Sequence, residues 1–203
     1  MSTQLFFSYC VALFIASIIP GPSMLLALTQ GSKLGITAGV FSAFGNVVAS
    51  VTQGIVALFF IVKAGQLSPS LLFAIKIIGA AYIVYLGTTL LSVSGFGEPA
   101  KTTLVKERFV ARKCVWDGFA FAIFNPKALT FFAALFPQFV RSGEVTAQTI
   151  FIVFAPIVII AFICFMSYVV AGVALFRLLG SSKHIGKLLG GGIILAGISL
   201  LFS

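Results

Sequence analysis

Long stretches without a single charged side chain are the feature that most constrains how this chain can fold. Aspartate, glutamate, lysine and arginine are all absent from residues 1–32, 34–62, 77–97 and 145–176. Each stretch has the roughly 20 residues that a helix needs to cross the hydrocarbon core of a bilayer. Only 8% of the 203 residues are charged, whereas a soluble domain has about 25%. The sequence therefore predicts an all-α integral membrane protein.

Two further apolar segments, one around Lys127 and one at the C-terminal end, bring the predicted set to about six membrane-spanning helices. We place these spans at about residues 4–28, 37–62, 70–92, 115–140, 146–176 and 185–203. The connections after spans 1, 3 and 5 carry nine basic residues, against two after spans 2 and 4. The positive-inside rule then predicts that both termini face outward. This loop bias accounts for the net charge of +9, so the bilayer is the expected partner and nucleic acid is not.

A basic loop at about residues 93–113 divides the single transporter-like domain into two halves of three spans, at about residues 1–92 and 114–203. The third span of each half opens with the pattern K-x-x-G, at Lys76 and at Lys187. Because three is an odd number, two such copies insert with opposite orientation. The sequence thus predicts two inverted three-helix repeats, the architecture of many secondary transporters.

The first span of each half is interrupted by proline. The segment Pro20-Gly21-Pro22 breaks span 1, and Asn125-Pro126-Lys127 breaks span 4. Irregular backbone at membrane depth must face protein or water, because lipid cannot bond its polar groups. Freed carbonyl oxygens could bind an ammonium group, and the amides that start the next half-helix could bind a carboxylate. We therefore expect these six residues to form a midplane ligand site.

Lys127 is the most unusual of these residues, because it lies near the middle of its span. A lysine at that depth costs about 2.5–3.5 kcal/mol on insertion scales unless it is paired or hydrated. No acidic residue lies at the same depth in any predicted span. Backbone carbonyls, water or the carboxylate of a substrate must therefore serve as its partner.

Two further features have a structural and a functional interpretation. Asp117 lies at the predicted cytoplasmic start of span 4, where it would either complement the helix dipole or serve in proton coupling. Gly31, Gly35 and Gly39 recur every four residues, a spacing that permits close helix contact within one chain or between the subunits of a homo-oligomer.

Several of these motifs together resemble the LysE/RhtB family of amino-acid exporters over essentially the whole chain. The resemblance rests on the Pro20-Gly21-Pro22 break, on GAAY…LG at residues 79–87, and on NPKA…LFPQF at residues 125–139. It implies a bacterial inner-membrane efflux carrier that exports amino acids or their derivatives by antiport with protons. It implies no other cofactor, and homo-oligomers are compatible with it.

The chain departs from that family in two places. Some members carry an acidic residue in helix 5, where this chain has only Pro156 and the polar residues Ser167 and Tyr168. Many members carry an acidic residue in helix 2, where this chain has Gly45-Asn46. Asn46 is therefore an additional candidate for the site, and no carboxylate would neutralise a cationic substrate side chain. We expect a neutral amino acid, bound through its carboxylate by Lys127 and through its ammonium by the carbonyls around residues 20–22 and by the Asn125 oxygen, in a site that opens outward as the halves rock.

Other classes of protein remain open at this stage. An exporter of ions, metals or other small metabolites on a similar repeat would need acidic or thiol ligands at the midplane. A membrane enzyme or a non-transporting assembly protein would need a catalytic cluster or an extended soluble surface. The sequence has no HExxH or GxSxG motif and a single histidine, His184, so we predict neither an enzyme nor a metal site.

Overall fold

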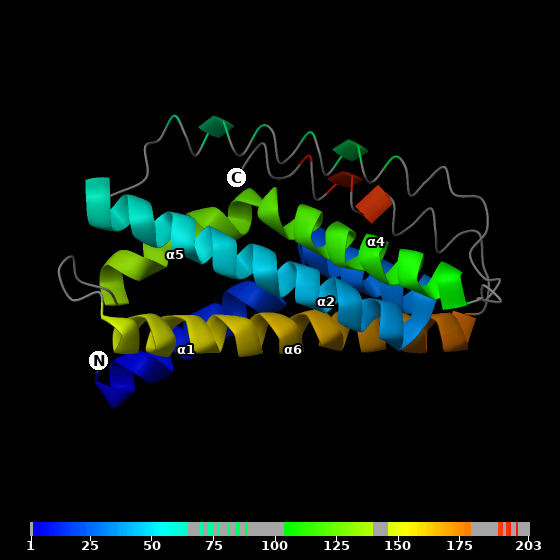
Figure 1. The fold of residues 1–203 in the computed structure, drawn as a ribbon, viewed down its shortest axis with the longest axis horizontal. Coiled ribbons are helices and arrows are strands. Elements are labelled where there is room, and N and C mark those ends of the chain that lie inside the picture. Colours follow the sequence, from blue (N-terminus) through cyan, green and yellow to red (C-terminus); the bar gives the residue numbers. More distant parts are fainter. Residues whose placement is uncertain are drawn as a thin grey trace.

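The protein is a bundle of helices arranged along one long axis (Figure 1). The computed structural model describes residues 2–64, 104–139 and 146–179, together with single positions between residues 70 and 88 and between 191 and 198. The helices of these ranges are α1 (Thr3–Ile18), α2 (Pro22–Ala64), α4 (Leu104–Ile123), α5 (Pro126–Phe139) and α6 (Ala147–Leu179). The described part of the chain is all-α, as predicted. Predicted spans 3 and 6, with Lys76 and Lys187, lie outside the described residues except for the single positions.

Two of the helices, α2 and α6, are long and apolar enough to cross a membrane, and the bent pair of α4 and α5 would be a third crossing segment. The helix α2 is itself divided at Gly35, whose φ of 81° and ψ of −173° are not helical. Glycine adopts a positive φ without the steric cost that other residues bear. The helix α2 therefore has two sections, residues 22–34 and residues 36–64, on either side of Gly35.

The break in span 1 falls where its prolines predict. The helix α1 ends at Ile18, the capping residue Ile19 is extended, and α2 begins at Pro22. A proline in the first turn of a helix has no backbone N–H to leave unpaired and has a suitable φ. The break in span 4 is similar, since α5 begins at Pro126 and the two helix axes on either side are bent by 58°.

The loop before span 4 is a correction to the prediction. We placed a loop at about residues 93–113, but α4 begins at Leu104, so residues 104–113 are helical. Between Leu104 and Asp117 there is no proline or glycine, and the segment is rich in strong helix formers such as lysine, arginine, glutamate and alanine. Asp117 consequently lies well inside α4, so its interpretation as a charge at the helix N-terminus is wrong.

Close contacts at glycine bring the helices together. A Cβ atom on Gly31 or Gly39 would collide with Val169 of α6, so the predicted close helix contact is confirmed at these two positions. At Gly35 the prediction is wrong, because nothing lies near its missing side chain and the residue forms the turn instead.

The second section of α2 makes an equally close contact with α4. Cβ atoms added to Gly45 and Gly118 would collide with the backbone carbonyls of Val115 and Ser42, respectively. These contacts fix α2 between α4 and α6, the two helices against which it packs most extensively.

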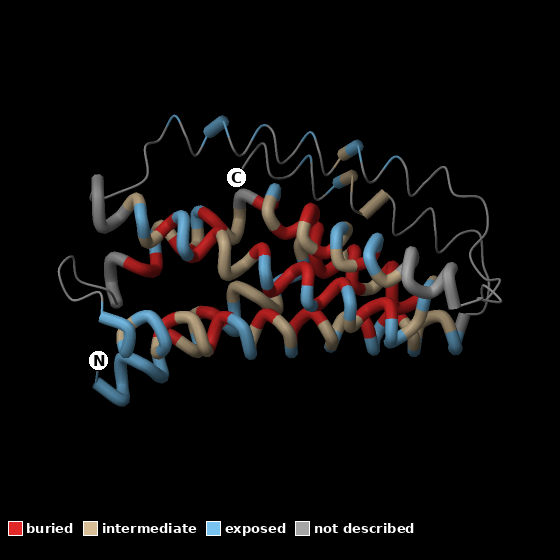
Figure 2. The backbone as a smooth tube through the Cα atoms, viewed as in Figure 1, coloured by how far each residue is buried: buried red, intermediate tan, exposed pale blue. Residues whose placement is uncertain are grey.

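The outer surface carries many large apolar side chains, as expected of a protein in lipid, and part of the interior is an apolar cluster. A buried cluster joins α1, α2, α5 and α6 through Tyr9, Leu13, Ala57, Leu129, Phe132, Leu135, Phe136, Val153 and Ile157. Figure 2 shows buried residues along the inner faces of the helices. Large side chains such as Phe7, Phe151 and Leu178 are 70%, 74% and 82% exposed, which suits contact with acyl chains.

Candidate functional site

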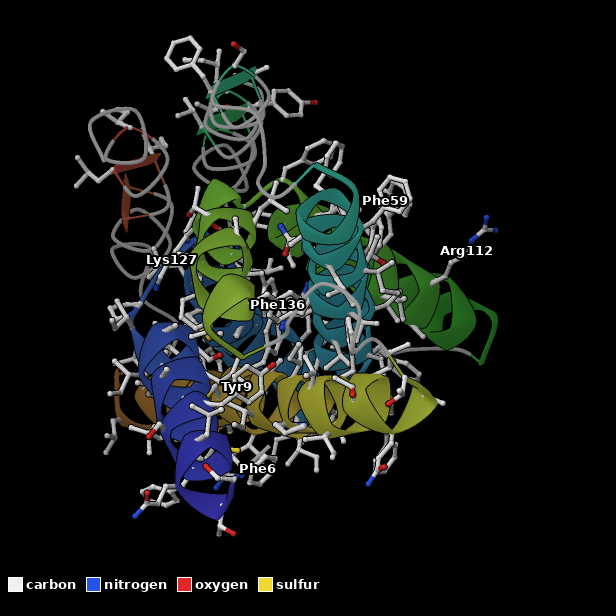
Figure 3. All side chains as sticks on the ribbon, turned by 90° about the vertical axis from the view of Figure 1, so that its left-hand side faces the viewer. Phe6, Tyr9, Phe59, Arg112, Lys127 and Phe136 are labelled. Carbon is white, nitrogen blue, oxygen red and sulfur yellow. The ribbon has the colours of Figure 1, made fainter. Side chains whose placement is uncertain are left out.

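The first helix break is held by side chains from the second half of the chain. Its backbone carbonyls at Ile18 and Ile19 lie at the end of α1, where intrahelical partners run out. The Tyr168 hydroxyl of α6 donates a hydrogen bond to the Ile18 oxygen at 2.9 Å. The Lys127 ammonium of α5 donates to the Ile19 oxygen at 3.2 Å. Figure 3 shows where Lys127 lies on α5.

The second helix break is capped by its own asparagine. The Asn125 side-chain oxygen accepts a hydrogen bond from the Lys127 backbone N–H at 3.1 Å. An asparagine just before the first turn satisfies an amide that has no partner within the helix. This cap fixes the start of α5 and thereby the position of Lys127.

The carbonyls of the second break are held from the first half of the chain. The Gln53 side-chain Nε2 of α2 donates to the backbone oxygens of Ala122, Ile123 and Asn125, at 3.0, 3.2 and 3.1 Å. Gln53 is only 3% exposed. Each break is therefore stabilised by polar side chains that the other half contributes.

A cavity of about 80 Å³ lies where the two breaks meet. Four of the predicted site residues line it: Gly21, Asn46, Asn125 and Lys127. Pro20 and Pro22 adjoin Gly21 but do not line the cavity, and Pro126 is described only through its backbone, as the first residue of α5.

The remaining lining combines small polar groups with apolar walls. The polar residues are Ser17, Ser23, Ser50 and Gln53, and the large apolar ones are Leu13, Ile19, Met24, Phe131, Phe132, Ile157 and Ile160. None of the described residues that line the cavity is acidic. Chemically, this site combines one cation, several hydrogen-bonding groups and apolar surface, which suits a small ligand with an anionic group and an apolar part.

Sequence reasoning missed Gln53 and Tyr168, the two residues that bond the breaks across the halves. Both carry polar groups in otherwise apolar helices, and such groups seek partners on neighbouring helices. That signal was present in the sequence, but an uncharged side chain stands out much less than a lysine does.

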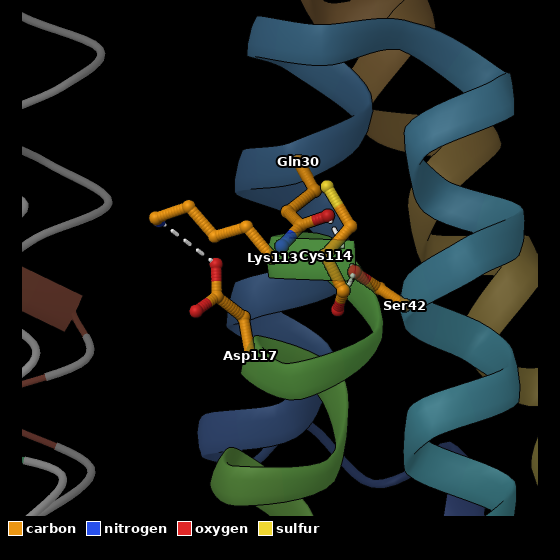
Figure 4. Close-up of polar contacts among 5 residues, drawn as sticks. All are labelled: Gln30, Ser42, Lys113, Cys114 and Asp117. Carbon is orange, nitrogen blue, oxygen red and sulfur yellow. Dashed lines mark hydrogen bonds and ion pairs between the residues drawn. The ribbon is translucent and has the colours of Figure 1, made fainter. Parts of the chain in front are cut away.

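Asp117 lies in a different polar cluster, away from the cavity lining. Its carboxylate forms an ion pair with Lys113 at 3.1 Å, one helical turn away on α4, and the two side chains are 24% and 67% exposed. Next to this pair, Ser42 bonds the Cys114 carbonyl at 2.8 Å and the Gln30 side-chain oxygen at 2.5 Å (Figure 4). The Ser42 hydroxyl therefore links α4 to both sections of α2.

A lipid-compatible bundle whose broken helices surround a partly polar cavity has the architecture of a membrane transporter. Comparison with known proteins identifies the family to which this transporter belongs. The chain belongs to the family of LysE type translocators, whose family model matches residues 14–203. It is therefore a transporter and not an enzyme.

Curated relatives match most of the chain. A leucine efflux protein from Enterobacter sp. (strain 638) is 28% identical over 204 residues, covering 93% of this chain and 89% of the relative. A leucine efflux protein from Salmonella typhimurium is 26% identical, with coverages of 90% and 85%. An uncharacterized membrane protein from Pseudomonas aeruginosa is 26% identical, with coverages of 81% and 77%. No solved structure matches the chain.

Proposed function

We propose that the protein exports neutral amino acids with apolar side chains from the cytoplasm across the bacterial inner membrane. The observation that carries this proposal is the cavity at the two helix breaks, which combines Lys127 with apolar walls. Family membership supports export of a small molecule. The relatives named as leucine efflux proteins support an aliphatic amino acid as the substrate.

The proposed binding mode assigns the two charged groups of the substrate to the two breaks. Lys127 binds the carboxylate, and the positive end of the α5 helix dipole favours the negative charge there. The N–H groups at the start of α5, which the sequence suggested for this role, are not available, since Pro126 has none and those of Lys127 and Ala128 bond Asn125. Carbonyl oxygens around residues 20–22, together with the Asn125 oxygen, bind the ammonium. The aliphatic side chain contacts walls such as Phe131 and Ile157. Among the described lining residues there is no carboxylate to compensate a second positive charge, so lysine and arginine are poor substrates.

The proposed transport cycle is alternating access between two inverted halves, residues 1–92 and 114–203, coupled to proton antiport. The reciprocal hydrogen bonds between the breaks support a division into halves that meet at the site. As the halves rock, these bonds lengthen and the cavity opens to one side of the membrane.

Both termini lie outside in this proposal. The turn within α2, the start of α4 and the end of α6 lie together at one end of the bundle (Figure 1). Lys33 and Arg177 are close in sequence to that end, which favours it as the cytoplasmic one.

Transport in proteoliposomes tests the proposal. Proteoliposomes that contain the purified protein are loaded with unlabelled amino acid. Counterflow of radiolabelled leucine, isoleucine, valine, lysine and arginine is then measured with and without an imposed pH gradient. We expect counterflow of the neutral aliphatic amino acids, with little of the cationic ones, and a response to the gradient. Failure of every amino acid to move in folded, inserted protein would overturn the proposal.

A further inference from the structure

Gln53 is held in a single orientation by its surroundings. Its side-chain nitrogen faces the carbonyl oxygens of Ala122, Ile123 and Asn125. Carbonyl oxygens only accept hydrogen bonds, so the side chain must present its NH₂ group to them. This settles which end of the amide is nitrogen, an assignment that often rests on the hydrogen-bond network alone. The side-chain oxygen, Oε1, must therefore point away from these three carbonyls.

That oxygen is buried and accepts no hydrogen bond from any described residue. Buried polar atoms in native proteins almost always have a partner, and each exception calls for an explanation. Gln53 is also one of the residues that line the cavity between the breaks. Less than 1 Å² of this oxygen is accessible, so an N–H donor in the cavity would satisfy it after a small shift of the Gln53 side chain or its neighbours.

Three other candidate acceptors at the site already have donors, whereas Asn46, which also lines the cavity, offers a second side-chain oxygen. The Asn125 side-chain oxygen accepts from the Lys127 backbone N–H, and the Ile18 and Ile19 carbonyls accept from Tyr168 and Lys127. Their second lone pairs remain usable, but each is weakened as an acceptor by the bond it already makes. Gln53 Oε1 has no such competition.

We propose that Gln53 Oε1 accepts a hydrogen bond from the α-ammonium group of the substrate and thereby selects amino acids over simple carboxylic acids. This inference rests on the proposed function and deepens it. Lys127 binds the carboxylate, and Gln53 binds the ammonium without adding a negative charge that would attract a cationic side chain. A neutral acceptor in this role fits the absence of acidic side chains among the described residues of the cavity wall.

A comparison of two ligands tests this role. Leucine and 4-methylpentanoate, which is leucine without its amino group, are each bound as radiolabelled ligands to the full-length protein in lipid nanodiscs. In Gln53→Met the side chain keeps its length and loses the acceptor. We expect leucine affinity to fall about tenfold or more, as for a hydrogen bond to a charged group, while 4-methylpentanoate affinity changes less than about twofold.

A second variant preserves the bonds that Gln53 makes to the helix break. Gln53→Lys retains N–H donors for the three carbonyls, lacks an acceptor and adds a positive charge, so it should weaken leucine relative to 4-methylpentanoate, whose carboxylate the added charge favours. Thr52→Val is the matched control: its hydroxyl bonds Val48 in its own helix, and Thr52 is not a lining residue. We expect Thr52→Val to leave both affinities unchanged.

The outcomes separate the two proposals. If Gln53→Met and Gln53→Lys weaken both ligands equally, or weaken neither, the role of Gln53 in recognising the ammonium is overturned while the exporter proposal stands. If the wild-type protein binds no neutral amino acid at all, the proposed function itself fails.

Discussion

The side-chain nitrogen of Lys127 lies 3.2 Å from the backbone oxygen of Ile19 and donates a hydrogen bond to it. This bond joins the two helix breaks, which are far apart in the sequence, across the wall of the cavity. A neutral carbonyl is a weaker partner for an ammonium than a carboxylate is. The carboxylate of a substrate would therefore compete with Ile19 for Lys127, and binding would loosen a contact between the halves.

Replacement of Lys127 is the most direct test of this exchange. Lys127→Ala should lower leucine counterflow by about 100-fold or more, because a charge-assisted hydrogen bond and the only described cation of the cavity wall are both lost. Lys127→Arg keeps the charge but has a different shape, so we expect partial activity. Lys113→Ala is the control, since it removes an exposed lysine of an ion pair. Full activity of Lys127→Ala in correctly inserted protein would contradict this role.

The glycine contacts predict that two substitutions to alanine differ clearly in their effect on stability. Gly118→Ala places a Cβ against the Ser42 carbonyl, and overpacking of this kind costs about 1–3 kcal/mol. Gly21→Ala is the matched control, because nothing lies within 4 Å of the added carbon and Gly21 does not have a positive φ. Thermal unfolding in detergent, monitored by size-exclusion chromatography, should show a lower midpoint temperature for Gly118→Ala than for Gly21→Ala.

The parts of the structure that follow from local chemistry could be predicted from the sequence. Proline at residues 22 and 126 fixed where the broken helices resume, because the missing N–H acts within one turn of the chain. The cost of a charge in lipid identified Lys127, and it lines the cavity together with Gly21, Asn46 and Asn125.

The parts that depend on distant segments could not be predicted. Gln53 bonds carbonyls about 70 residues away, and nothing in its own helix indicates which break it contacts. Gly35 and Gly39 have the same spacing pattern in the sequence, yet one forms a turn and the other packs on α6. Whether a glycine forms a turn or a close contact depends on the helix that packs against it. A single sequence does not show which helices pack together.

Two tyrosines allow the role of the first break to be separated from general stability. The Tyr168 hydroxyl donates a hydrogen bond to the Ile18 carbonyl at the break. The Tyr9 hydroxyl of α1 donates to the Val153 carbonyl of α6, away from the break. Loss of either bond should cost about 0.5–1.5 kcal/mol. We expect Tyr168→Phe to reduce the leucine counterflow rate several-fold more than Tyr9→Phe, because of the two tyrosines only Tyr168 bonds a carbonyl of the helix break. Equal rates in the two variants, at equal thermal stability, would argue against this link.

The last prediction concerns Asp117 and proton coupling. Its carboxylate pairs with the exposed side chain of Lys113, and Asp117 does not line the cavity. An exposed pair of this kind contributes little to stability, about 0–1 kcal/mol. Asp117→Asn should therefore fold normally and retain leucine movement driven by an imposed pH gradient in proteoliposomes. Wild-type protein and Lys113→Gln, which breaks the same ion pair from the other side, are the controls. If Asp117→Asn alone abolishes the response to the gradient while counterflow without a gradient persists, Asp117 carries the coupled proton, and the coupling site lies outside the cavity.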